Sequence, residues 1–176
     1  MKITDQIENA AYHEAGHAVM AYQVDWWVRY VEIYGIKNGK KDYTALTRYS
    51  LYDDSGRALL INCAGWLSEW KNDNGGEKLK PQDHLDFVYD EVQSLLYYDE
   101  DDIINCGDDG SSIFRIIKDF PNFSEVQVIK YYRKCELEAW GILENPEVWS
   151  KVEKLAKALL EKGKIEKNEV EKIICS

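Results

Sequence analysis

The chain is organised around Ala11-Tyr-His-Glu-Ala-Gly-His-Ala-Val-Met20, in which His13, Glu14 and His17 follow the spacing His-Glu-x-x-His. Side chains four residues apart lie on one face of an α-helix, so both imidazoles can reach a single metal ion. Neutral imidazole nitrogen is a ligand that zinc prefers. Glu14 lies one step round the helix, where its carboxylate can take a proton from a zinc-activated water. The spacing predicts zinc ligands at His13 and His17 and a general base at Glu14.

The residues around the motif favour a helix over about 5–24, because alanine is the strongest helix former and occurs there five times. Gly16 is a weak helix former, but it carries no side chain and lets another backbone, or a substrate, approach closely. The alternative interpretation is an amphipathic helix with two incidental histidines. The motif supplies two ligands, and a catalytic zinc site needs at least a third.

Composition favours one ordered domain over residues 1–176. Of its residues, 45% are hydrophobic and 12% aromatic, which is enough for a substantial core. The net charge of −10 disfavours binding to nucleic acids or anionic membranes, since like charges repel.

The expected compartment is the cytoplasm. The first residues do not resemble a signal peptide, and the longest apolar stretch, Ala58 to Leu67, is far shorter than the roughly 20 residues of a membrane span. The cysteines form no CxxC pair and are expected to be reduced, buried thiols. They are Cys63, Cys106, Cys135 and Cys175.

The segment after the first helix predicts a β-hairpin. Trp26 to Ile36 and Tyr43 to Leu51 are rich in aromatic and β-branched residues, and Lys37-Asn-Gly-Lys-Lys-Asp42 between them predicts a turn. Such a hairpin either holds an extended substrate beside the metal or serves only as a packing layer.

Apolar spacing and capping residues predict helices in the rest of the chain, so the expected fold is mainly α with a small β-hairpin or sheet. The acidic segment 99–110 does not match the EF-hand spacing and is expected to be a solvated connection. The expected helices run from about Gly56 to Lys71 after Ser55, from Asp83, from Ser111 to Asp119, from Ser124 to about Leu143, from Asn145-Pro146 to Gly163, and from about Asn168 to Ile174.

A third zinc ligand is not given by the first motif. The extended pattern HExxHxxGxxH is absent, because Met20 and Gln23 stand where its glycine and third histidine would be. The third ligand is therefore expected far along the chain. Residue type alone leaves four candidates open: Glu69, Asp83, His84 and Asp86.

The chain resembles the peptidase domain of FtsH-type AAA+ metalloproteases in several places. Tyr12-His-Glu-Ala-Gly-His-Ala-Val19 is similar to the zinc helix of that family, and Cys63-Ala-Gly-Trp-Leu-Ser-Glu69 matches its Gly-Gly-Arg-x-Ala-Glu segment at Gly65 and Glu69. Gln82-Asp83-His-Leu85 resembles its Asn-Asp-Leu stretch, and residues 154–170 resemble its closing helices. These matches follow the family's order over most of the chain.

The resemblance implies a mostly helical metallopeptidase domain with His13, His17 and Asp83 as zinc ligands and Glu14 as the base. It places Glu69 near the site, where it either orients a ligand histidine or serves as a structural helix residue. The implied substrate is a peptide or an unfolded protein.

Two departures from the family bear on partners. The sequence contains no Gly-x-x-x-x-Gly-Lys-Ser/Thr phosphate loop, so ATP hydrolysis by that route is not expected. The membrane anchor of the family is not expected either. An AAA+ unfoldase would act in trans, or the substrates would be already unfolded or short. Peptidase domains of that family assemble as rings, so the resemblance suggests a homo-oligomer. The alternative function is a catalytically inactive zinc-binding or assembly module.

Overall fold

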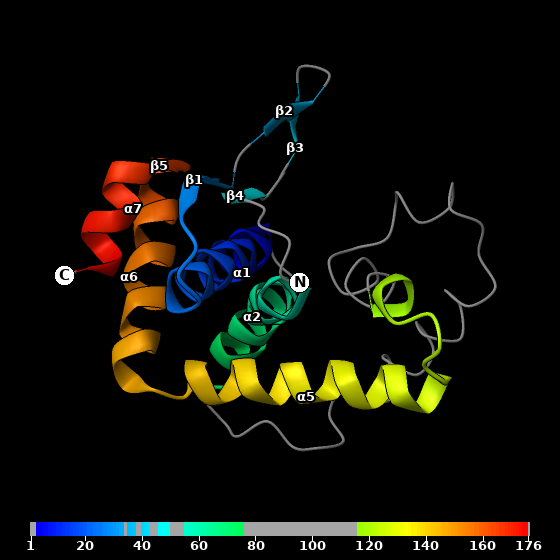
Figure 1. Ribbon diagram of the computed structural model, residues 1–176. Coiled ribbons are helices and arrows are strands. Elements are labelled where there is room, and N and C mark those ends of the chain that lie inside the picture. The colour runs from blue at the N-terminus through cyan, green and yellow to red at the C-terminus, as the bar shows by residue number, and fades with distance from the viewer. Residues whose placement is uncertain are drawn as a thin grey trace.

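The computed structural model describes residues 3–33, 35–37, 40–42, 46–49, 55–75 and 116–175. Within these residues the chain is mainly helical with small antiparallel sheets, as predicted (Figure 1). The helix expected from Asp83, the acidic segment 99–110 and the cap at Ser111 lie outside the described residues. Of the helix expected to end at Asp119, residues 116–119 are described and are helical.

Two helices pack against each other at the centre of the molecule, α1 (Ile3–Gln23) and α2 (Ser55–Asp73) (Figure 1). A methyl group on Gly16 of α1 would lie 2.3 Å from the carbonyl oxygen of Ala64 on α2, well inside van der Waals contact. The glycine therefore lets the two backbones come together, which is one of the two roles expected for it. Small buried side chains line the same helices: Ala11, Ala15, Ala18, Ala58 and Ala64.

The next two helices begin and end close to the predicted residues. In front of α5 (Glu125–Leu143), the Ser124 backbone N–H donates to Gln127 Oε1 at 2.8 Å, one half of a capping box. Asn145 caps α6 (Pro146–Lys162), with its Oδ1 accepting from the Glu147 backbone N–H at 2.9 Å. Gly163 follows α6 with φ of 76°, a conformation that glycine adopts without strain.

A three-stranded antiparallel sheet lies over one end of the helices, in the order β4-β1-β5 (Figure 1). Its strands are β1 (Val28–Glu32), β4 (Leu46–Tyr49) and β5 (Lys164–Glu166). The pairing of β1 with β4 confirms the predicted hairpin, although the first predicted strand is interrupted after Glu32. The strand β5 was not predicted, because a run of three residues is too short to show an alternating pattern.

A second, two-stranded sheet joins β2 (Gly35–Lys37) to β3 (Lys40–Asp42) and extends away from the helices (Figure 1). The prediction that Lys37 to Asp42 is all turn is wrong, since Lys40 pairs with Lys37 and only two residues connect the strands. Two-residue connections are the commonest in hairpins, and Asn38-Gly39 is the sequence that favours them.

Two expectations based on composition can be compared with the structure. Cys63 and Cys135 are buried, but Cys175 is exposed, so its prediction as a buried thiol is wrong. The reason is its position after Ile174, the last buried residue of α7 (Lys167–Ile174); Cys106 lies outside the described residues. None of the described helices is long and apolar enough to cross a membrane.

Candidate metal centre

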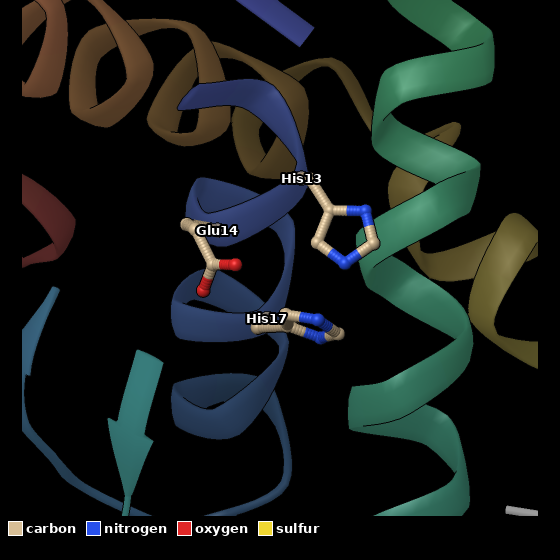
Figure 2. Close-up of side chains that lie close together, drawn as sticks. All are labelled: His13, Glu14 and His17. Atoms are coloured by element: carbon tan, nitrogen blue, oxygen red, sulfur yellow. The ribbon is translucent and has the colours of Figure 1, made fainter. Parts of the chain in front are cut away.

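Helix α1 brings His13, Glu14 and His17 together, as the spacing predicts (Figure 2). One potential ligand atom from each side chain lies within 4.8 Å of those of the other two. The two imidazole rings are nearly perpendicular, at 85°, with their centroids 4.6 Å apart. Both rings lie on the side of α1 that faces α2. The three side chains can therefore meet at one ion.

The orientation of His17 is fixed by the backbone of α2. Its Nδ1 lies 2.7 Å from the carbonyl oxygen of Ile61, and the side chain is buried. A carbonyl oxygen can only accept a hydrogen bond, so Nδ1 must carry the hydrogen. In the neutral ring, Nε2 then keeps the lone pair that a metal ligand needs.

His13 is held by a carboxylate in the corresponding way. Its Nδ1 lies 3.4 Å from Glu69 Oε2 on α2. The contact with His13 lowers the pKa of Glu69 against the opposing effect of burial, so the carboxylate form is favoured. A carboxylate accepts from Nδ1, and Nε2 of His13 then carries the lone pair that a metal ligand needs.

Asn9 extends this arrangement by one further residue. Its Nδ2 donates to Glu69 Oε1 at 3.3 Å and to Asp73 Oδ2 at 2.9 Å. The Asn9 side chain is buried, and it links two carboxylates that lie one turn apart on α2. The contacts of Asn9 with Asp73 and of His17 with Ile61 show that α1 and α2 run antiparallel.

Both imidazole rings pack closely against Gly65 of α2. A methyl group placed on Gly65 would lie 2.5 Å from Nε2 of His17 and 2.8 Å from Nε2 of His13. Such a group would also lie 2.4 Å from Cε1 of His17, so a side chain at this position would push the rings away from their present places. The described residues therefore fit a zinc ion held by two imidazoles.

Glu14 is buried, with only 4% of its surface exposed, and it contacts the sheet. The hydroxyl of Thr47 on β4 lies 2.6 Å from Glu14 Oε2, and 3.0 Å from the Glu14 carbonyl oxygen. A buried carboxylate needs such a donor, because an unpaired charge away from water is strongly destabilising. The strand β4 therefore contributes directly to the site.

The described part of the chain contains four of the residues singled out from the sequence: His13, Glu14, His17 and Glu69. The other candidates for the third ligand, Asp83, His84 and Asp86, lie outside it, so their roles stay predictions. Sequence reasoning missed Asn9 and Thr47. The sequence could have pointed to Asn9, because it precedes His13 by four residues and so lies on the same face of α1. The sequence could not have pointed to Thr47, because its contact with Glu14 depends on the packing of β4 against α1.

No protein-family model matches this chain, and neither does any curated protein. The resemblance to FtsH-type peptidase domains therefore stays a prediction that rests on the quoted segments.

Proposed function

We propose that this protein is a zinc-dependent metallopeptidase that hydrolyses peptides or unfolded proteins without hydrolysing ATP itself. One observation carries the proposal. One potential ligand atom from each of His13, Glu14 and His17 lies within 4.8 Å of those of the other two. Asp83 is the third ligand that the family resemblance implies.

Each described residue has a distinct task in this proposal. His13 and His17 would hold the ion through Nε2, while Glu69 and the Ile61 carbonyl keep their rings in the ligand tautomer. A bound zinc ion would acidify a water molecule and polarise the substrate carbonyl. Glu14 would accept the proton of that water at a carboxylate oxygen and pass it to the leaving amine. An AAA+ unfoldase in trans and a homo-oligomer are further proposals from the resemblance.

The substitution Glu14→Gln tests the base directly. The amide has nearly the same shape but cannot accept the proton, so the variant should keep the wild-type zinc content and lose on the order of 10²- to 10⁴-fold in hydrolysis rate. Zinc is measured by elemental analysis after purification without chelator. Hydrolysis is followed with a fluorescently labelled unfolded protein.

Glu8→Gln is the matched control, since Glu8 is exposed on the same helix and should leave both measurements unchanged. A Glu14→Gln variant as active as the wild type would exclude Glu14 as the base. Wild-type protein that binds zinc but cleaves nothing would instead favour the inactive zinc-binding module. Wild-type protein without zinc would exclude both functions.

A further inference from the structure

The Glu14 carboxylate is close enough to the two histidines to serve in either of two roles. One of its oxygens lies within 4.8 Å of a ligand nitrogen of each ring, near enough to bind the same ion. Carboxylate oxygen is an accepted zinc ligand. A carboxylate that binds the ion, however, is a weaker base, because the positive charge favours its deprotonated form. The proposed peptidase therefore needs something that keeps Glu14 from becoming a ligand.

Thr47 makes a short contact with that carboxylate. The 2.6 Å separation between its Oγ1 and Glu14 Oε2 is typical of a hydroxyl donating to a charged carboxylate. The hydroxyl has one hydrogen, and the Glu14 carbonyl oxygen is further away at 3.0 Å. The carboxylate is therefore the better acceptor.

The position of Thr47 is set by rigid parts of the fold. It lies on β4, where its backbone pairs with Val31 of β1, and it is buried. A β-branched side chain is also stiff at χ1, so the hydroxyl has little freedom to follow a moving carboxylate. Glu14 is anchored to the sheet as a result.

The hydrogen bond with Thr47 holds the Glu14 carboxylate on a different side of α1 from the two imidazoles. Both rings lie between α1 and α2, whereas the Glu14 side chain leaves α1 on the neighbouring side (Figure 2). The Thr47 hydroxyl meets it there, from the sheet. Movement of the carboxylate toward the two imidazoles would lengthen or break this hydrogen bond.

We propose that Thr47 is a positioning residue: its hydroxyl holds Glu14 off the metal and so keeps it available as the base. This inference rests on the proposed function. Without the hydroxyl, Glu14 binds the ion in part of the molecules, which changes the ligand set and leaves less Glu14 available as the base.

The test compares wild type, Thr47→Val and Thr47→Ser after loading with Co²⁺, whose visible absorption reports the number and type of ligands. Valine keeps the shape of threonine without its hydroxyl, whereas serine keeps the hydroxyl. In Thr47→Val the absorption bands should shift and change in intensity. Peptide hydrolysis by its zinc form should fall roughly 10- to 100-fold, as when other hydrogen-bond partners in metal sites are lost. Thr47→Ser should match the wild type in both measurements.

Three outcomes would count against the inference. A Thr47→Val spectrum identical to that of the wild type would overturn it while leaving the proposed function intact. If Thr47→Ser changes as much as Thr47→Val, the hydroxyl is not the determinant. If the wild type binds no Co²⁺ and no zinc, the proposed function fails and this inference fails with it. Far-ultraviolet circular dichroism of each metal-free variant separates misfolding from a changed site.

Discussion

At the scale of single residues, Gly65 has the clearest physical reason for its identity. A glycine within a helix is about 1 kcal/mol less favourable than alanine, so α2 would be more stable with any ordinary side chain there. The reason for glycine lies across the interface, where the rings of His13 and His17 occupy the space of a Cβ atom. The glycine makes α2 less stable, but it allows the two imidazole rings to pack against this helix.

Gly65→Ala should therefore lose most of its bound zinc and still fold. The added methyl group would lie 2.4 Å from Cε1 of His17, and the ring must move away from the point it shares with His13. Zinc content by elemental analysis and helix content by circular dichroism measure the two effects separately.

Gly141→Ala is the matched control for this substitution. Gly141 is also within a helix, α5, but no atom of the described residues lies within 4 Å of an added methyl group. It should keep its zinc and gain slightly in stability. Equal zinc contents in the two variants would show that Gly65 does not keep the space open.

At the scale of secondary-structure elements, Lys71 connects three helices. Its Nζ donates to the carbonyl oxygen of Leu143, the last residue of α5, at 2.6 Å. It also lies 5.4 Å from the ring centre of Trp140 on α5 and 4.5 Å from that of Trp149 on α6. A cation at the C-terminal end of a helix is favoured by the helix dipole, and aromatic faces also attract it. Burial lowers the pKa of this lysine, and the nearby carboxylates of Glu144 and Glu153 partly offset that effect.

Lys71→Met should lower the free energy of unfolding by about 1–3 kcal/mol, the usual contribution of a hydrogen bond from a charged group. Methionine keeps an unbranched apolar side chain but cannot donate to Leu143. Urea unfolding measures the change. Lys157→Met on the exposed face of α6 is the control and should change it by less than about 0.5 kcal/mol. Equal changes would mean that the buried contacts of Lys71 add nothing.

At the scale of the whole molecule, β5 joins the C-terminal part of the described chain to β1 in its N-terminal part. Ile165 pairs with Val31 of β1 and is completely buried. The strand β1 thus lies between β4, which carries Thr47, and β5, which leads into α7. Helices α6 and α7 are held against the same sheet that supports the candidate site.

Ile165→Ala should destabilise the entire fold by about 2–5 kcal/mol, because it leaves a cavity at this junction. Ile173→Ala on α7 is the control, since that side chain is only partly buried and should lose less. Denaturant unfolding followed by both fluorescence and circular dichroism measures the loss. An equal loss in the two variants would argue that β5 is not a special junction.

The sequence by itself determined the features that depend on neighbouring residues. The caps at Ser124 and Asn145 and the stop at Gly163 placed α5 and α6 almost to the residue, because capping acts within one helical turn. The spacing of His13 and His17 placed both imidazoles on one face for the same local reason.

Only the tertiary structure decided how the site is completed. The contacts of Glu14 with Thr47, of His13 with Glu69 and of His17 with Ile61 each join residues far apart in the chain. No local pattern encodes such contacts, because they depend on how α1 packs against α2 and β4. The strand β5 also depends on tertiary structure, since its three residues form a strand only by pairing with the edge of β1.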